Sequence, residues 1–250
     1  MKKLRTIAII PARLESSRLH GKALLDICGF PMIVHVFKRC EFAESLDEVF
    51  VATDNDKIRQ VVEQYGGKVI MTSSNHENGT ERIVEAAKNI DADIVVNVQG
   101  DEALVSPTHI DAAVNALIKD QNVNVAILVN EFSKRNSPAD IKTVLDEENN
   151  VMYLSRSDIP SDARTNNPPM LKAYHILPFR KEFLLKYASW GKGFLEQIEY
   201  HEHLRILEKG YKIRAVRVDS DALSVDTEED LDFVRNAMIS DSIFKKYGRS

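Results

Sequence analysis

Short apolar runs alternate with amphipathic stretches through the first half of the chain, and this alternation restricts the fold more than any other feature. The apolar runs predict strands at residues 6–10, 49–53, 68–71, 94–98 and 123–129. Apolar residues at helical spacing predict helices after Asp54, over 81–90 and after Ser106-Pro107. Such an order is typical of a parallel sheet with helices on both faces. We therefore predict an α/β fold with a doubly wound, mostly parallel sheet.

Local signals predict where two of these helices begin. Asp54 is expected to cap a helix that ends at Gly66-Gly67, and Thr80 is expected to cap the next one. A side-chain oxygen at such a position accepts a hydrogen bond from a first-turn N–H group.

The second half of the chain is less regular. Strand-like pieces occur at 143–145, 151–155 and 173–179, and a polar loop at 161–170 contains two prolines. A long helix is predicted over 194–209, closed by Gly210, and is followed by a strand at 211–218 and a last helix at 227–238. We expect one domain over residues 1–250, with an inserted arm or small subdomain at about 151–190.

Composition excludes several classes of protein. The chain has 250 residues, 44% of them hydrophobic, which is enough for a sizeable core. A net charge of −5 argues against general binding of nucleic acid. Cys28 and Cys40 are too few for a disulfide framework. No window approaches the roughly 20 apolar residues of a membrane span, and the first apolar run is too short for a signal peptide. We expect a soluble, cytoplasmic protein.

A cationic loop follows the first predicted strand, which we expect to stop at Pro11. Arg13, Arg18 and Lys22 recur at intervals of four or five residues, and the loop between them holds Ser16, Ser17 and Gly21. Backbone N–H groups, hydroxyls and basic side chains together suit a polyphosphate. The spacing does not match a Walker A loop.

Two aspartates are candidate metal ligands. Asp101 comes directly after the strand at 94–98, and the carboxyl ends of parallel strands are where ligands bind. Mg²⁺ favours a few carboxylates together with substrate phosphates. Asp226 precedes Thr227 and Asp230, which form an acidic capping box. Asp226 either caps this last helix or faces the same metal as Asp101 while Thr227 caps.

Arg82 lies in the first turn of a predicted helix, where the helix dipole disfavours a cation. It is either a solvent-exposed helix residue or a contact to an anionic or carbonyl-bearing ligand.

We expect ordinary structural roles for His35, His201 and His203. His201-Glu202-His203 does not match H-E-x-x-H, because Arg205 stands where the second histidine is needed. On the predicted helix the two rings would point about 200° apart, so we do not expect structural zinc. His35 is expected to be an exposed or half-buried helix residue.

Five ordered motifs resemble the 3-deoxy-manno-octulosonate cytidylyltransferases, the CMP-Kdo synthetases. The resemblance covers residues 9 to about 235. The motifs are Pro-Ala-Arg-x-x-Ser-x-Arg-Leu-x-Gly-Lys from Pro11, Gly-Thr-Glu-Arg from Gly79, Val-Gln-Gly-Asp-Glu from Val98, Leu-Glu-x-Ile-Glu from Leu195 and Ser-Val-Asp-Thr-x-Glu-Asp-Leu from Ser224.

The resemblance implies a nucleotide-diphospho-sugar transferase-like fold and a reaction between CTP and an acidic ulosonic sugar. It implies that the CTP triphosphate contacts Arg13, Lys22, Ser16, Ser17 and Arg18, and that Arg82 and Gln99 lie by the cytosine and ribose. Asp101 and Asp226 would bind Mg²⁺. The sugar would lie near Arg156, Tyr174, His175, Glu196 and Glu199, with Arg205 on the same helix. A homodimer through the arm at 151–190 is also implied.

The chain departs from the family pattern mainly at the sugar side. His20 and Ala23 replace prolines in the first motif, and Ala103 replaces the proline after Glu102. The family strand His-x-Gly-x-Tyr-x-Tyr-Arg reads here Ala173-Tyr174-His175-Ile176-Leu177-Pro178-Phe179-Arg180. An altered sugar such as the 8-amino analogue of the octulosonate is therefore a hypothesis, with His175 or Glu102 as partners for the amine.

Two other functions remain open. One is a different enzyme on the same nucleotide fold, either a glycosyltransferase or a cytidylyltransferase for a nine-carbon acid such as sialic acid. The other is a non-catalytic CTP-binding regulatory protein, which would bind CTP without turnover.

Overall fold

A computed structural model of the chain describes residues 3–15, 19–165, 167–219 and 223–248. The chain divides into two compact units. The first comprises residues 1–111 and 222–250, and the second comprises residues 112–221. Helix α4 (Pro107–Lys119) carries the chain from one unit into the other and begins at Pro107, as the sequence predicts.

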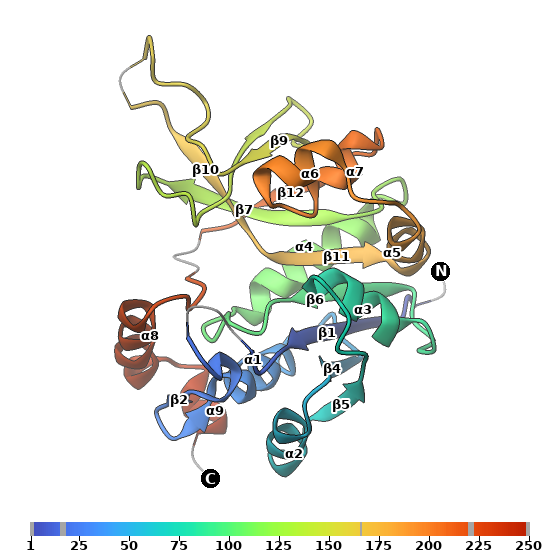
Figure 1. Ribbon diagram of the computed structural model, residues 1–250, viewed down its shortest axis with the longest axis vertical. Helices are drawn as coiled ribbons and strands as arrows, with labels where there is room; N and C mark the ends of the chain where they lie inside the picture. The colour runs from blue at the N-terminus through green and yellow to red at the C-terminus, as the bar shows by residue number, and fades with distance from the viewer. Residues whose placement is uncertain (1–2, 16–18, 166, 220–222, 249–250) are drawn as a thin grey trace. The chain divides into compact units, whose positions relative to one another are not determined.

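A parallel sheet forms the centre of the first unit (Figure 1). Within it β6 (Ile94–Val98), β1 (Thr6–Ala12), β4 (Glu48–Thr53) and β5 (Lys68–Met71) lie side by side in that order. Helices α1 (Met32–Cys40), α2 (Asp56–Gln64) and α3 (Gly79–Ala87) pack against these strands. The interior of β1 and all of β6 are buried, which explains their continuous apolar runs. The predicted parallel α/β architecture is confirmed.

The strand order creates a switch point between β1 and β6. The chain first builds outward from β1 to β4 and β5, and then returns to add β6 on the other side of β1. Loops that follow two such strands diverge and leave a crevice at their carboxyl ends, where open α/β sheets bind ligands. The cationic loop follows β1, and Asp101 follows β6. The topology therefore brings these two sequence motifs to one edge of the sheet.

Strand β1 continues through Pro11 to Ala12, so the prediction that it stops at Pro11 is wrong. Pro11 is in register with Ala52 of β4, whereas the pairing of β1 with β6 ends at Ile9. Beyond Ile9 the strand has one parallel neighbour in the first unit, and a residue without an N–H group is tolerated at such an edge.

The C-terminal segment returns to the first unit. A short helix η1 (Lys22–Leu24) leads into the hairpin of β2 (Asp26–Ile27) and β3 (Phe30–Pro31). Helix α8 (Glu228–Ser240) lies beside β2 (Figure 1), and α9 (Phe244–Tyr247), which we did not predict, follows it. One apolar cluster contains residues from the loop and hairpin at 19–32, from the loop after β6 and from the C-terminal segment. They are Leu19, Ile27, Met32, Ala103, Val225, Leu231, Val234 and Met238.

A mixed sheet forms the second unit. Its strands lie in the order β12 (Arg214–Arg217), β7 (Ala126–Phe132), β10 (Met170–Tyr174), β8 (Lys142–Leu145) and β9 (Val151–Ser155). Strand β12 runs parallel to β7, and the other pairs are antiparallel. Strand β11 (Ile176–Arg180) and helices α5 (Lys181–Ala188), α6 (Phe194–Glu199) and α7 (Leu204–Glu208) complete the unit. The segment 151–190 lies within it.

The predicted helix over 194–209 is wrong, because it is two short helices. Tyr200 ends α6 in a left-handed conformation, with φ of 49°. The chain then passes through 201–203 before α7 begins at Leu204. The apolar pattern alone does not reveal this break, because a bulky residue rarely adopts positive φ. The predicted strand over 173–179 is likewise interrupted, at His175.

Both predicted helix caps in the first unit are displaced. Asn55 caps α2 and accepts hydrogen bonds from Lys57 N and Ile58 N, while Asn78 caps α3 and accepts one from Glu81 N. Because Asn is a better cap than Thr, cap preference accounts for Asn78, whereas Asn55 and Asp54 are equally good caps and either could have capped α2. The Asp54 carboxylate contacts Arg82 instead, whereas Thr80 Oγ1 has no hydrogen-bond partner among the described residues.

Three further expectations can be compared with the structure. His35 is completely buried rather than exposed or half-buried. Cys28 and Cys40 are free thiols. Among the described residues, no helix has the length and apolar character needed to cross a membrane.

Candidate active site

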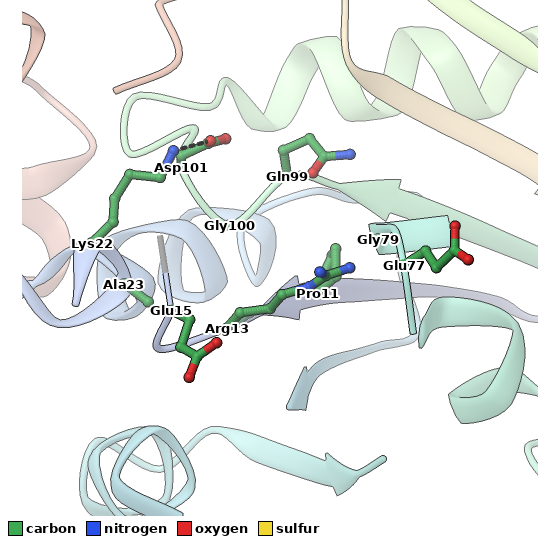
Figure 2. A pocket seen from close by; sticks show the side chains of 11 residues that line it. Pro11, Arg13, Glu15, Lys22, Ala23, Glu77, Gly79, Gln99, Gly100 and Asp101 are labelled. Atoms are coloured by element: carbon green, nitrogen blue, oxygen red, sulfur yellow. Dashed lines mark hydrogen bonds and ion pairs between the residues drawn. The ribbon is translucent and has the colours of Figure 1, made fainter. Parts of the chain in front are cut away.

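A cleft of about 340 Å³ opens at the switch point of the first unit (Figure 2). Residues from the end of β1, from η1, from the start of α3 and from the loop after β6 line it. They are Pro11, Ala12, Arg13, Glu15, Lys22, Ala23, Glu77, Gly79, Gln99, Gly100 and Asp101.

Lys22 joins the two aspartates that the sequence singles out. Its Nζ atom lies 2.6 Å from Asp101 Oδ2 and 3.2 Å from Asp226 Oδ1, and it donates a further hydrogen bond to the carbonyl of Val225 at 2.9 Å. Figure 2 shows the first of these ion pairs at the cleft. Residues more than 200 positions apart therefore meet at one ammonium group.

Backbone contacts fix this arrangement. Val225 N donates to the carbonyl of Asp101, which ties the C-terminal segment to the loop after β6. Thr227 caps α8 by accepting a hydrogen bond from Asp230 N, and the Asp230 carboxylate accepts from the N–H groups of Asp226 and Thr227. Thr227, not Asp226, is therefore the cap of α8, and the Asp226 carboxylate contacts the same ammonium group as Asp101 does.

The environment keeps Lys22 charged. Burial opposes its charge, but the attraction of Asp101 and then of Asp226 outweighs burial, so the pKa of the ammonium is raised. The side chains of all three residues retain partial exposure to solvent. The two carboxylates are near enough to share one cation and are open to ligands. Oxygen donors of this type, combined with substrate phosphates and water, fit Mg²⁺.

Arg82 is neither solvent-exposed nor on the lining of the cleft. It is completely buried in the first turn of α3, where Nη1 donates to Thr72 Oγ1 at 2.6 Å and lies 3.3 Å from Asp54 Oδ1. Burial lowers the pKa of this guanidinium, Asp54 opposes that shift, and nearby Arg13 adds to it. Its Nε atom has no hydrogen-bond partner among the described residues. Two adjacent cations and an unused donor suit an anionic or carbonyl-bearing ligand.

Sequence reasoning missed the contact of Asp54 with Arg82. We expected Asp54 to cap α2, and Asn55 directly after it was the available signal that a second residue could take this position. Because Asn55 caps the helix, the Asp54 carboxylate can face the buried guanidinium instead.

Two glycines allow the loops of the cleft to approach each other. A Cβ atom on Gly100 would lie 2.8 Å from the carbonyl oxygen of Pro11, and one on Gly79 would lie 3.2 Å from the Pro11 ring. Gln99, beside them, donates a long hydrogen bond to Asn97 at 3.4 Å. The Gln-Gly-Asp sequence is thus held close to the end of β1.

Several predicted residues lie outside this cleft or outside the described chain. Ser16, Ser17 and Arg18 are not among the described residues. Glu102 is buried in the first unit and accepts a short hydrogen bond from Ser224 Oγ.

In the second unit, Arg156 and Glu199 contact each other and the neighbouring backbone. The Glu199 carboxylate accepts hydrogen bonds from Ser155 Oγ at 2.8 Å and from Arg156 N at 2.9 Å. The Arg156 guanidinium donates to the carbonyls of Glu199, Pro138 and Tyr200. Both side chains retain some exposure.

Glu196 and Arg205 form a buried, two-pronged ion pair. Arg205 Nε and Nη2 lie 2.7 and 2.6 Å from the two carboxylate oxygens, and Gly193 N also donates to this carboxylate. The hydrogen bonds from Glu196 raise the pKa of Arg205 against the effect of burial. Glu196 thus has its oxygens occupied by partners that hold α6 against α7.

Tyr174 and His175 lie at the junction of β10 and β11. Tyr174 is buried, whereas His175 is partly exposed and its ring lies against those of His201 and His203. Burial, reinforced by neighbouring histidines and arginines, lowers the pKa of His203 to about 3 and that of His201 well below its usual value. The break at Tyr200 brings His201 and His203 to His175. The two residues are not on one helix, so the expected separation of about 200° between their rings does not apply.

Known cytidylyltransferases are similar to this chain over most of its length. The cytidylyltransferase family matches residues 7–213. The 3-deoxy-manno-octulosonate cytidylyltransferase of Geobacter metallireducens is 40% identical over 245 residues, covering 92% of this chain and 96% of that protein. The enzyme of the same name from Geobacter sulfurreducens is 41% identical over 241 residues, covering 91% and 96%.

This chain belongs to the 3-deoxy-manno-octulosonate cytidylyltransferase family.

Solved structures agree with this assignment. A structure of CMP:2-keto-3-deoxy-manno-octonic acid synthetase complexed with CTP superposes with a TM-score of 0.90 at 37% identity and covers 94% of this chain and 98% of its own. A cytidylyltransferase from Leptospira borgpetersenii shares the fold, with a TM-score of 0.66 at 20% identity. Membership of the family makes this chain a nucleotidyltransferase, and the resemblance and fold class predicted from its motifs are confirmed.

Proposed function

We propose that this protein couples CTP to 3-deoxy-manno-octulosonate, releasing pyrophosphate and forming the CMP-sugar used in lipopolysaccharide biosynthesis. The observation that carries the proposal is the meeting of Lys22, Asp101 and Asp226 beside the cleft at the switch point. The relatives that share 40% of the sequence carry this activity in their names.

The reaction is an in-line displacement at phosphorus. The anomeric hydroxyl oxygen of the sugar forms a bond to the α-phosphorus of CTP, the bond from that phosphorus to the bridging oxygen breaks, and the hydroxyl proton is lost to solvent or base. Such transfers depend on positioning and on charge neutralisation rather than on a covalent intermediate with the protein.

Cationic side chains at the cleft match the charge of the leaving group. Arg13 lines the cleft and Lys22 stays protonated, so both can stabilise the negative charge that develops on pyrophosphate. Arg82 and Gln99 are proposed to contact the nucleoside, and the buried Nε atom of Arg82 has no hydrogen-bond partner in the part of the chain that the structure describes.

Asp101 and Asp226 are the residues that would hold Mg²⁺. Bound there, the ion would neutralise phosphate charge and lower the pKa of a hydroxyl group near it. Lys22 would keep the two carboxylates together, because its ammonium already contacts both.

The proposal is tested by an assay that measures the release of pyrophosphate from CTP in the presence of Mg²⁺ and the octulosonate. We expect turnover by the wild type, a large loss in Lys22→Ala, and no change in Lys38→Ala, which removes a surface lysine paired with Glu41. CTP binding without release of pyrophosphate would favour the regulatory alternative. Turnover only with sialic acid would place the protein among the nine-carbon sugar enzymes, and sugar transfer without release of pyrophosphate would indicate a glycosyltransferase.

A second candidate substrate is the 8-amino analogue of the octulosonate. The departure that favours it lies in the segment 173–180, where the imidazole of His175 stands at the glycine of the family pattern. A higher kcat/KM for the amine than for the hydroxyl sugar supports this choice. Equal turnover of both, or preference for the hydroxyl form, contradicts it.

We also propose a cytoplasmic homodimer. Exposed apolar side chains on α6 and β9, namely Phe194, Ile198 and Met152, support a protein contact on the second unit. Light scattering should report twice the chain mass, and Ile198→Asp should lower it. A monomeric wild type would exclude the dimer.

A further inference from the structure

Three histidines from separate parts of the second unit form one cluster. His175 lies between β10 and β11, and His201 and His203 lie in the link between α6 and α7. One ring nitrogen from each residue lies within 4.8 Å of the others. The ring centroids are separated by 5.6 Å between His175 and His201, by 5.1 Å between His201 and His203, and by 6.3 Å between His175 and His203.

These separations are near those of a metal site. Three imidazoles that bind one tetrahedral Zn²⁺ at about 2.0–2.1 Å hold their nitrogens roughly 3.4 Å apart and their ring centroids roughly 5 Å apart. The observed centroids already approach this value. Small rotations of the three side chains would bring the nitrogens to the required distance.

Three buried ring nitrogens of the cluster have no hydrogen-bond partner among the described residues. They are His201 Nε2 and both ring nitrogens of His203. His201 is 6% exposed and His203 is 1% exposed, so solvent does not substitute. Leaving buried polar atoms unpaired costs free energy, which a metal–nitrogen bond would recover.

The neighbouring charges are compatible with a cation. Two guanidinium groups act on the cluster. That of Arg205 on α7 is neutralised by both oxygens of Glu196, and that of Arg156 donates hydrogen bonds to backbone carbonyls. The Glu202 carboxylate lies 3.9 Å from His203 Nε2 and offsets positive charge. Neutral imidazoles contribute no charge of their own.

We propose that His175, His201 and His203 form a three-histidine site for a divalent transition-metal ion such as Zn²⁺, with a fourth position open to water or another ligand. Imidazole nitrogen favours zinc-type ions over Mg²⁺, which takes oxygen ligands. The site is therefore separate in chemistry from the carboxylates Asp101 and Asp226. A bound ion would join the β10–β11 junction to the link between the two short helices.

Binding of Co²⁺ and Zn²⁺ tests this site without any assay of turnover. The full-length chain is purified without a histidine tag, freed of metal and titrated with Co²⁺, whose visible absorption reports tetrahedral nitrogen ligation. We expect one Co²⁺ per chain, displaced by Zn²⁺ but not by excess Mg²⁺. Because the measurement is of metal alone, failure to release pyrophosphate would leave it unaffected.

Variants separate the cluster from other histidines. His175→Ala removes a partly exposed ligand, and His203→Gln keeps most of the volume of a buried one. Each should lose roughly 100-fold or more in affinity, since even outer-shell partners of metal ligands are worth about 10–100-fold. His20→Ala, which removes an exposed histidine elsewhere, should bind as the wild type does. Circular dichroism of each metal-free variant reports its folding.

Two results would overturn the proposal. One is a wild type that binds no more Co²⁺ than His175→Ala. The other is a folded His175→Ala whose affinity and spectrum match the wild type.

Discussion

Each unit contains a cluster of oppositely charged side chains, and the two clusters differ in their exposure to solvent. Lys22, Asp101 and Asp226 are partly open to solvent, and both carboxylates contact the Lys22 ammonium. Glu196 and Arg205 are buried, and the carboxylate of Glu196 is filled by Arg205 and Gly193 N. Charged groups that remain accessible can exchange partners for a ligand. Groups that are buried with both oxygens occupied, as in Glu196, hold neighbouring elements together.

The largest effect is expected where the open cluster loses a carboxylate. Asp101→Asn or Asp226→Asn should reduce turnover by roughly 10²–10⁴-fold, because the proposed metal loses an anionic ligand at the reacting phosphate. Steady-state rates of pyrophosphate release over a range of Mg²⁺ concentrations measure this, and higher Mg²⁺ should restore part of the loss. Near-normal rates in both variants would remove the metal assignment.

The next effect should appear in stability rather than in turnover. Glu196→Gln leaves the Arg205 cation buried without its counter-charge and should cost about 3–5 kcal/mol in the free energy of unfolding, measured with urea. The double variant Glu196→Leu/Arg205→Met removes both charges and should be less destabilised. A Glu196→Gln variant of normal stability but with a raised KM for the sugar would instead assign Glu196 to the substrate, as the family resemblance implies.

A smaller effect is expected from crowding at the cleft. Gly100→Ala places a Cβ atom against the Pro11 carbonyl and should cost about 1–3 kcal/mol, since backbone atoms on both sides must shift. The affinity for CTP should fall as well, because Gln99 and Asp101 move with this loop. Gly191→Ala, where a Cβ meets open space, is the matched control. Equal melting temperatures for both variants would contradict the close approach.

The smallest effect is expected in the pH dependence of stability and comes from His35. This histidine is buried, and both of its ring nitrogens have hydrogen-bond partners, unlike those of His203. His35 Nε2 donates to the carbonyl of Ile27 at 2.7 Å, and Nδ1 accepts from the Tyr247 hydroxyl at 2.6 Å. Burial lowers the pKa of His35 below its usual value. The unfolded chain therefore binds the proton more readily, and the stability due to neutral His35 is present above about pH 6.5 and is lost as the pH falls.

Replacing this ring tests the sign of the effect. His35→Gln should flatten the decline of unfolding free energy below pH 6.5 by at most about 1.4 kcal/mol per pH unit. Urea unfolding at several pH values, with His20→Ala as control, measures it. An unchanged slope would show that His35 is not held neutral in the folded state.

The sequence predicts the first unit well because its signals are short-range. The period of apolar residues predicts β5 and β6 at the bounds that the structure has, and Thr227 and Asp230 predict the start of α8. Asp101 was placed at a strand end by the same pattern, and the parallel sheet then implied a ligand site there. These inferences need only residues a few positions apart.

Tertiary structure alone decided which groups are buried and which partners they take. Arg82 reads as a helix residue that could face solvent, yet packing buries it beside Asp54. His201 and His203 meet His175 only because Tyr200 adopts positive φ and ends a helix that the apolar pattern would continue. A local pattern fixes the period of an element, whereas burial and partner choice depend on contacts between residues far apart in the chain.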